Sequence, residues 1–264
     1  MILKFEKYQG AGNDFVIIDN RKGEFSPSID TVEMLCDRNF GIGADGLMLL
    51  EKDDKHDFYM RYFNADGKES TMCGNGGRCI SVFARSLGLG SAEKVEFNSI
   101  DGLHEAFFTE EDGEMLVKLK MIDVKEVEEN DDYYFVNTGS PHYVAFVEDL
   151  ENLDVYEEGQ AIRNDPKFAP GGTNVNFVEI FDDEIFVRTY ERGVEDETLA
   201  CGTGSTAAAI AASLFLESDQ NVWDVEVMGG NLQVSFDRKE DGTFENVWLT
   251  GPAEKVFEGT INVE

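Results

Sequence analysis

Apolar and polar residues alternate along much of this chain in short runs that are typical of strands with one buried face. Alternation with a period of two places every second side chain on the same side of a strand, and short apolar runs suit strands that are buried on both sides. In the first half of the chain, the pattern predicts strands at residues 2–8, 14–19, 47–51, 58–64, 94–98, 103–109 and 115–120. In the second half, it predicts strands at 133–137, 143–148, 175–181, 185–191, 225–228, 232–236 and 247–250. Strands therefore outnumber helices.

Helical patterns are confined to a few segments, and two of these segments follow a cysteine and several small residues. After Cys73, one helix face gathers the residues Cys79, Ile80, Phe83, Ala84 and Leu87. Gly88 predicts the end of this helix. After Cys201, residues 207–216 are apolar on almost every side, which predicts a helix enclosed by a sheet.

Two further helix starts are predicted from capping patterns. Ser26 followed by Pro27 indicates a cap with proline in the first helical position. Asp154, with Glu157 three residues later, indicates a capping box. The two predicted caps are 128 residues apart.

The spacing of 128 residues returns elsewhere, which indicates a duplicated module. Cys73-Gly-Asn-Gly-Gly is similar to Cys201-Gly-Thr-Gly-Ser, again at a spacing of 128. We expect an N-terminal module of residues 1–125, joined by a C-terminal strand at 253–264, and a C-terminal module of residues 126–252. The predicted fold class is α+β, with two pseudo-symmetric domains, each a curled antiparallel sheet around a central helix.

Composition and charge restrict the possible partners. The 264 residues are 42% hydrophobic, which is enough for a folded core, and 22 Lys and Arg against 54 Asp and Glu give a net charge of −32. Such a field repels phosphate backbones and anionic lipid surfaces, so neither nucleic acid nor membrane is an expected partner. The N-terminal residues do not have the pattern of a secretory signal, and we expect a cytoplasmic protein with a small-molecule substrate.

The four cysteines do not suggest a disulfide framework or a metal site. A cytoplasmic protein rarely keeps disulfides, and Cys73 and Cys79 are six residues apart, a spacing that matches no common zinc pair. The three histidines are scattered along the chain. No metal ligand is therefore predicted.

The repeated cysteines are the candidate chemistry. Each precedes small residues at a helix start, where several backbone N–H groups converge, and such a position stabilises a thiolate and binds an anion. Cysteines at helix N-termini can have a pKa lowered from roughly 8.5 to roughly 3.5–7.5. A lone cysteine is more often a small buried residue, but two at equivalent positions of a repeat favour chemistry. Helix starts that face each other across a domain cleft suit the inversion of a stereocentre, in which Cys73 and Cys201 act as base and acid.

Several ordered motifs give the chain a resemblance to the diaminopimelate epimerase family, from about residue 2 to the C-terminus. The motifs are Gly10-Ala-Gly-Asn-Asp-Phe15, Gly41-Ile-Gly-Ala-Asp-Gly46, Phe63-Asn-Ala-Asp-Gly67, Cys73-Gly-Asn-Gly-Gly-Arg-Cys79, Tyr190-Glu-Arg-Gly193 and Ala200-Cys-Gly-Thr-Gly204. The resemblance implies an isomerase that interconverts LL- and meso-diaminopimelate in lysine and peptidoglycan precursor synthesis. It also implies a homodimer that uses neither pyridoxal phosphate nor a metal.

The resemblance further implies roles for individual residues. Cys73 and Cys201 are the implied acid/base pair, and His142 is an implied auxiliary residue near the cysteines. The implied substrate-binding residues are Asn13, Asn64, Gly74, Asn75, Ser140, Asn174, Glu191, Arg192, Gly202 and Thr203. Ser140 stands where many members of the family have Asn.

Other readings stay open at this point. Gly41-Ile-Gly-Ala-Asp-Gly46 matches a dinucleotide-binding pattern, but a predicted helix precedes it and a strand follows, which is the reverse of the required order. A racemase of the proline or hydroxyproline type is the nearest alternative, although that family usually has His where Asn75 stands. From a different class, the chain is also compatible with a thiol redox switch or a non-catalytic amino acid sensor.

Overall fold

The computed structural model describes residues 1–71, 73–111, 113–181 and 184–263, and the chain divides into two compact units. Unit 1 consists of Met1–Leu119 with Gly251–Glu264, and unit 2 consists of Lys120–Thr250. Glu264, the last residue of the predicted C-terminal strand, lies outside the described residues. The predicted modules were defined by the sequence repeat, whereas these units are defined by contacts between residues. The predicted boundaries therefore stay a prediction.

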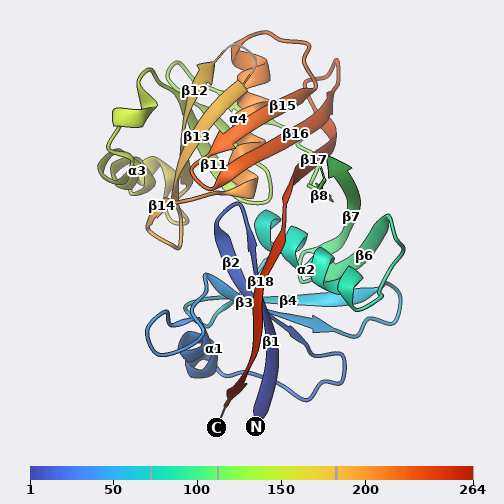
Figure 1. Cartoon of the computed structure of the whole chain (residues 1–264). Helices are drawn as coiled ribbons and strands as arrows, with labels where there is room; N and C mark the ends of the chain where they lie inside the picture. Colours follow the sequence, from blue (N-terminus) through green and yellow to red (C-terminus); the bar gives the residue numbers. More distant parts are fainter. Residues whose placement is uncertain (72, 112, 182–183, 264) are drawn as a thin grey trace. The chain divides into compact units, whose positions relative to one another are not determined.

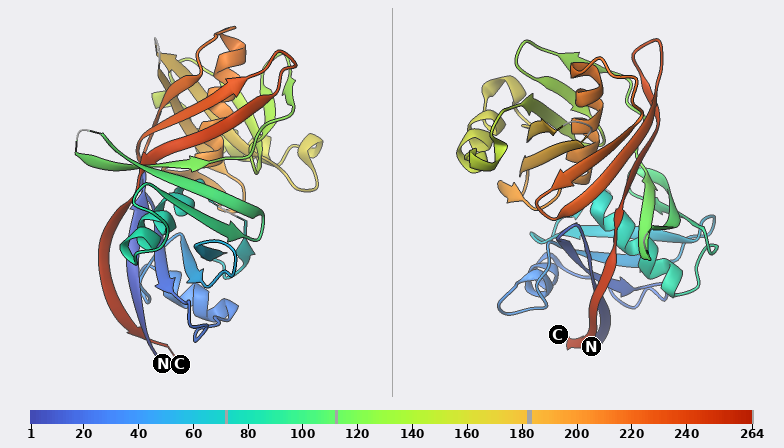
Figure 2. Two further views of the ribbon diagram at one scale, coloured as in Figure 1. Left: turned by 90° about the vertical axis from the view of Figure 1, so that its right-hand side faces the viewer. Right: turned by 45° about the horizontal axis from the view of Figure 1, so that its top comes forward.

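Unit 1 is a curved sheet with one long helix against it. Its strands are β1 (Ile2–Gly10), β2 (Asn13–Asp19), β3 (Gly46–Glu51), β4 (Phe58–Asn64), β5 (Glu69–Ser70), β6 (Lys94–Ser99), β7 (Gly102–Glu111), β8 (Glu114–Lys120) and β18 (Glu254–Asn262). Its helices are α1 (Ile29–Cys36) and α2 (Gly74–Ser86). The neighbours in the sheet are β18, β1, β2, β3, β4, β6, β7 and β8, in that order, and β5 pairs with β4. Figures 1 and 2 show β18 running beside β1, so the C-terminal strand completes this unit.

Unit 2 repeats this arrangement. Its strands are β9 (Val127–Glu129), β10 (Tyr134–Asn137), β11 (Pro141–Phe146), β12 (Asn174–Phe181), β13 (Glu184–Glu191), β14 (Asp196–Thr198), β15 (Val222–Val227), β16 (Gly230–Arg238) and β17 (Phe244–Pro252). Its helices are α3 (Val155–Arg163), α4 (Gly202–Phe215) and the short 3-10 helices Leu150–Asn152 and Pro166–Phe168. The neighbours are β9, β10, β11, β12, β13, β15, β16 and β17, with β14 on β13. The order and direction of pairing match those of unit 1 strand by strand.

The predicted two-domain fold is confirmed, with one correction to the sheets. They are mixed rather than antiparallel, because β2 and β3, β4 and β6, β11 and β12, and β13 and β15 pair in parallel. Each of these pairs is joined through a helix, and a helical crossover returns the chain in the same direction, whereas a hairpin reverses it. Every predicted strand run overlaps an observed strand. The strands that the pattern missed, β5, β9 and β14, have only two or three residues, too few to show a period.

Both central helices, α2 and α4, are largely buried. In α4, nearly every residue is buried, and the helix contacts strands β10, β11, β12, β13, β15 and β16 (Figures 1 and 2). This confirms the prediction of a helix enclosed by a sheet. Helix α2 ends at Ser86, and Gly88 follows with φ +76°, the left-handed conformation that terminates helices. No helix in the described ranges is both long enough and apolar enough to span a bilayer.

One of the two predicted helix caps is wrong. Helix α1 is capped by Ser28, whose hydroxyl accepts a hydrogen bond from the Thr31 N–H at 3.2 Å, and not by Ser26. Pro27 therefore precedes the cap instead of opening the helix. In unit 2, Asp154 does cap α3, and its carboxylate accepts from the Glu157 N–H at 3.0 Å. The two caps are thus 126 residues apart rather than 128.

Candidate active site

Cys73 lies directly before α2, and Gly74 is the first helical residue. Cys73 has extended backbone (φ −103°, ψ 128°), and its carbonyl accepts the first helical hydrogen bond from the Gly77 N–H at 2.7 Å. The N–H groups of the first turn have no acceptor within a helix, so the positive end of α2 lies beside this sulfur. Gly76 allows the close packing behind it, because a Cβ there would lie 1.9 Å from Met48 Cε.

Cys201 occupies the same position on α4. Its backbone is extended (φ −120°, ψ 108°), Gly202 opens the helix, and the Cys201 carbonyl accepts from the Ser205 N–H at 2.8 Å. The sulfur is 3.5 Å from the hydroxyl oxygen of Thr203. A hydroxyl can donate to a thiolate or accept from a thiol, so this contact suits either protonation state.

Asn13 contacts Cys73 and Asn75 with the oxygen of its amide. Its Oδ1 accepts from the Asn75 Nδ2 at 3.2 Å and lies 3.6 Å from the Cys73 sulfur. Its Nδ2 donates to the Asp45 carboxylate at 2.5 Å, which fixes which end of the amide faces the sulfur. Asn13, Cys73, Gly74 and Asn75 are therefore one cluster in unit 1.

A charged network supports this cluster, and the sequence prediction did not include it. Asp14 pairs with Lys7 and Arg38, each at 2.7 Å, and Arg38 also pairs with Asp45 at 2.8 Å. Burial alone would raise the pKa of Asp14, but the hydrogen bonds from Arg38 and Lys7 hold that pKa below its usual range. Asp14 and Asp45 lie within the sequence motifs Gly-Asn-Asp-Phe and Gly-Ala-Asp-Gly. The motifs could therefore have pointed to these two acids, but the sequence prediction gave them no role.

Asn64 is the predicted site residue that lies apart from this cluster. It is exposed at the end of β4, opposite Gly46 in the strand register. Its neighbour Ala65 donates a backbone hydrogen bond to the carbonyl of Asp45 at 3.1 Å, so Asn64 borders the network. In the part of the chain that the structure describes, no hydrogen bond joins the Asn64 side chain to Asn13.

Ser140, Asn174 and Arg192 form a second cluster, in unit 2. Ser140 Oγ accepts from the Asn174 Nδ2 at 2.9 Å and from an Arg192 Nη at 3.2 Å. Asn174 Oδ1 accepts from the Arg192 backbone N–H at 2.9 Å. Glu191, the residue before Arg192, is half-buried at the end of β13, and its carboxylate accepts from the Thr198 hydroxyl at 3.0 Å. Four of the predicted substrate-binding residues are thus neighbours.

His142 is fully buried in unit 2 and reaches the start of α4 through Asn176. Asn176 Nδ2 lies 3.1 Å from His142 Nδ1, and Asn176 Oδ1 would be 2.4 Å from a Cβ at Gly204, beside the Cys201 sulfur. Burial lowers the pKa of His142 to about 3, and the Arg192 charge contributes in the same direction. The imidazole is therefore neutral at physiological pH.

The other two cysteines are buried thiols. Burial raises the pKa of both Cys36 and Cys79 to about 12, so both stay protonated in ordinary buffers. All four cysteines lie in the described ranges, and no disulfide joins any two of them. Within the described residues, no three His, Cys, Asp or Glu side chains are grouped as ligands of a metal ion.

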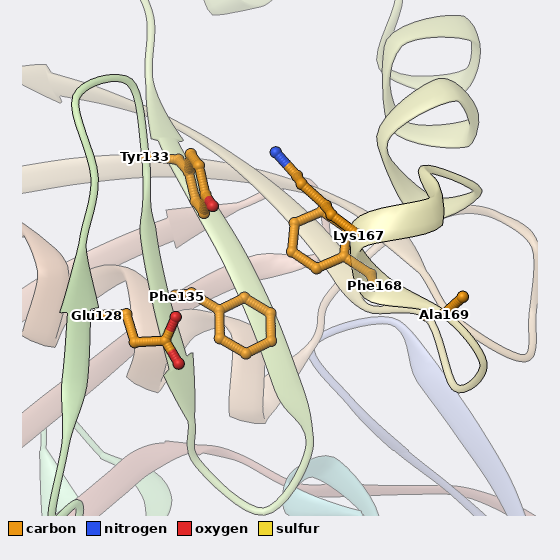
Figure 3. A pocket seen from close by; sticks show the side chains of 7 residues that line it. Glu128, Tyr133, Phe135, Lys167, Phe168 and Ala169 are labelled. Atoms are coloured by element: carbon orange, nitrogen blue, oxygen red, sulfur yellow. The ribbon is translucent and has the colours of Figure 1, made fainter.

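A hollow of about 300 Å³ on unit 2 is separate from these clusters. Figure 3 shows its lining residues, which include Glu128, Tyr133, Phe135, Lys167 and Phe168. The Lys167 amine already lies over the rings of Tyr133, at 4.4 Å, and Phe168, at 4.8 Å. None of the predicted site residues lines this hollow, and we assign it no role.

The two units share one topology, and each has a cysteine at the start of its central helix, an arrangement that suits an isomerase. The sequence model named diaminopimelate epimerase matches residues 5–126 and again residues 134–256. The chain therefore belongs to the diaminopimelate epimerase family, as the sequence motifs indicated.

Full-length relatives support this assignment. A diaminopimelate epimerase of Flavobacterium psychrophilum is 51% identical over 262 residues, covering 98% of this chain and 100% of the relative. One of Chlorobaculum tepidum is 44% identical, covering 96% of this chain and 99% of the relative.

Solved structures with much lower sequence identity share the fold. A phenazine biosynthesis protein of the PhzF family from Bacillus anthracis has a TM-score of 0.78 at 14% identity, with all of both chains covered. A hydroxyproline epimerase from Agrobacterium vitis has a TM-score of 0.72 at 14% identity, covering 98% of this chain and 92% of that one. At this identity, the likeness concerns the fold alone.

Proposed function

We propose that the protein interconverts LL- and meso-diaminopimelate by two-base proton transfer at Cα. The observation that carries the proposal is the equivalent position of Cys73 and Cys201, each in extended backbone before a glycine-led helix in a unit of the same topology. The thiolate of one cysteine removes the Cα proton, and the thiol of the other donates a proton to the opposite face of the same carbon. The two roles exchange in the reverse direction.

The helix starts supply the stabilisation that this chemistry requires. An amino acid Cα proton is very weakly acidic, so charge moving onto the carboxylate oxygens must meet preorganised donors. Backbone N–H groups at Gly74, Asn75, Gly202 and Thr203 belong to the first turns of α2 and α4 and serve as those donors. Neither a pyridoxal phosphate nor a metal ion is part of the proposed mechanism.

The remaining site residues recognise the distal amino acid centre of the substrate. Arg192 suits a carboxylate, because its guanidinium presents paired donors, and Glu191 suits an ammonium group. Asn13, Asn64, Ser140 and Asn174 add amide and hydroxyl groups. The Ser140 oxygen accepts from both Asn174 and Arg192, so its own hydrogen remains available for donation to the substrate. His142 is an uncharged auxiliary residue.

The family resemblance extends the proposal to the cellular setting. We propose a cytoplasmic homodimer that acts in lysine and peptidoglycan precursor synthesis. Size-exclusion chromatography with light scattering tests the dimer, for which a monomer mass of 29.5 kDa gives the reference.

Deuterium incorporation is the decisive test of the reaction. Reduced protein with pure LL-diaminopimelate in D2O, without added pyridoxal phosphate, is expected to give meso product that carries deuterium at Cα. Cys73→Ser and Cys201→Ser are each expected to lose most of this activity while they remain folded. Proline is the control substrate for the racemase alternative. Exchange with proline but not with diaminopimelate would favour that alternative, and turnover near the wild-type rate in either variant would contradict the two-base assignment.

A further inference from the structure

Arg78, in the first turns of α2, has a role that the proposed reaction leaves unassigned. Its side chain is fully buried. Nε donates to the Pro252 carbonyl at 3.2 Å, and one Nη donates to the Gly74 carbonyl at 3.4 Å. The second Nη has no partner among the described residues. Because Gly74 directly follows Cys73, a cationic group is fixed at the helix end that carries the sulfur.

This buried cation has no carboxylate partner in the described part of the chain. The nearby network of Lys7, Arg38, Asp14 and Asp45 contains two cations and two anions, so it is neutral as a whole. A buried charge without a counterion is costly, and it is normally neutralised or paired. Arg78 therefore leaves one uncompensated positive charge at the start of α2.

Unit 2 shows that the helix turn does not require this charge. The position equivalent to Arg78, 128 residues later, is Thr206. The Thr206 hydroxyl donates to the Gly202 carbonyl at 2.9 Å, the same contact that Arg78 makes with Gly74. A small neutral side chain is thus sufficient to complete the turn after Cys201. The buried cation therefore distinguishes the start of α2 from the start of α4.

Asn13 and Arg78 act on the ionisation of Cys73 in opposite directions. The Asn13 carbonyl oxygen, 3.6 Å from the sulfur, accepts from a thiol and so favours the protonated form. The Arg78 charge favours the thiolate. Burial lowers the pKa of Arg78, while negative charge on Cys79 and Cys73 would raise it, so the cation and these sulfurs interact. Since Cys79 stays protonated, the stabilisation is available to Cys73.

We propose that Arg78 is a positioning residue that favours ionisation of Cys73 over Cys201 in the resting protein. The consequence for catalysis, namely which cysteine removes the proton, rests on the proposed function. The resting Cys73 thiolate takes the Cα proton and becomes a thiol, while the Cys201 thiol gives its proton to the carbon and becomes a thiolate. The number of protons on protein and substrate together is unchanged.

The test measures thiolate formation at each cysteine without substrate. Reduced full-length protein is alkylated with iodoacetamide across pH 5–10, and mass spectrometry reports the rate at Cys73 and Cys201 separately. In the wild type, the midpoint of the Cys73 profile is expected to lie below that of Cys201. Arg78→Gln is expected to raise the Cys73 midpoint by about one pH unit and to leave Cys201 unchanged. Arg78→Lys, which keeps the charge, is expected to stay near the wild type.

Thr206→Val is the matched control, and it is expected to move neither midpoint. An unchanged Cys73 midpoint in folded Arg78→Gln, or equal shifts at both cysteines, would overturn the inference. If Arg78→Gln does not fold, the wild-type profiles still decide, because a Cys73 midpoint at or above that of Cys201 contradicts the proposal. Failure of deuterium exchange would instead refute the proposed function, since alkylation requires no catalysis.

Discussion

Asn176 fixes the tautomer of His142. The Asn176 Oδ1 accepts from the Thr189 hydroxyl at 3.0 Å, and its Nδ2 donates to the Tyr143 carbonyl at 2.8 Å, so the orientation of the amide is set. The second hydrogen of Nδ2 then points to His142 Nδ1, at 3.1 Å, which must accept it. The proton of the neutral imidazole is therefore on Nε2. In this state Nδ1 already accepts a hydrogen bond and Nε2 carries the proton, so neither ring nitrogen is available as a base; Nε2 has no partner among the described residues.

A stability difference at low pH follows from the burial of His142. The folded-state pKa of about 3 lies below the ordinary value of about 6.5, so the unfolded chain binds a proton that the folded chain does not. Above about pH 6.5, His142 does not change the free energy of unfolding with pH. As the pH falls from about 6.5 toward about 3, protonation of the unfolded chain lowers that free energy. In that window, the wild type is expected to lose about 1.4 kcal/mol per pH unit relative to His142→Gln. Urea unfolding of both proteins at several pH values between 7 and 4.5 measures this, and parallel curves would refute it.

Alkylation at pH 8 is expected to separate the four cysteines into two pairs. Cys36 and Cys79 are buried thiols whose pKa values are raised to about 12, so they have almost no thiolate at pH 8. Native reduced protein should therefore incorporate iodoacetamide only at Cys73 and Cys201, whereas protein unfolded in urea should react at all four positions. Peptide mapping distinguishes the sites. Fast labelling of Cys79 in the native state would contradict the burial.

Asp45 is expected to matter for substrate turnover through Asn13. Asp45→Asn removes the carboxylate that accepts from Asn13 Nδ2 and pairs with Arg38, so the Asn13 amide can rotate. We expect kcat/KM for diaminopimelate to fall by about tenfold, which corresponds to about 1.4 kcal/mol. Asp66→Asn is the control, because Asp66 makes an exposed pair with Lys68 in the turn after β4. Equal effects of the two substitutions would argue against a role for the network in orienting Asn13.

The strand order could not be predicted from the sequence, although the strands themselves could. Alternation marks strands such as β1 and β6, where buried residues repeat every second position. Whether two paired strands are parallel depends on the connection between them. The sequence prediction did not use helix α1, which connects β2 to β3, to predict that these strands are parallel. Ser26 was predicted as a cap from proline chemistry, but the helix is capped two residues later, where the Ser28 hydroxyl meets the Thr31 N–H.

The structure brings together the predicted site residues that lie in local motifs. Cys73, Gly74 and Asn75 are consecutive at a helix start, and so are Cys201, Gly202 and Thr203. The supporting groups come from separate segments: Asp45 is 32 residues from Asn13, and Asn176 is 34 residues from His142. Such contacts depend on sheet register, which a single sequence does not specify. The sequence shows Arg78 within the motif that begins at Cys73. It does not show that this side chain is buried without a counterion.

Gly204 is expected to tolerate no side chain. A Cβ at this position would lie 2.4 Å from Asn176 Oδ1, 3.2 Å from Cys201 Cβ and 3.3 Å from the Cys201 sulfur. Asn176 is buried and held by three hydrogen bonds, so it cannot move aside without breaking contacts to Thr189, Tyr143 or His142. Gly204→Ala should therefore reduce the free energy of unfolding by about 2 kcal/mol, as overpacking does, and lower activity as well.

Gly171→Ala is the matched control for this substitution. The nearest atom to a Cβ at Gly171 is an Arg192 Nη at 3.7 Å, an ordinary contact. The same added methyl group is therefore expected to change stability by less than about 0.5 kcal/mol. Urea unfolding compares the two variants. If Gly204→Ala were as stable and active as Gly171→Ala, then the tight packing of Asn176 against the start of α4 would not constrain the position of Cys201.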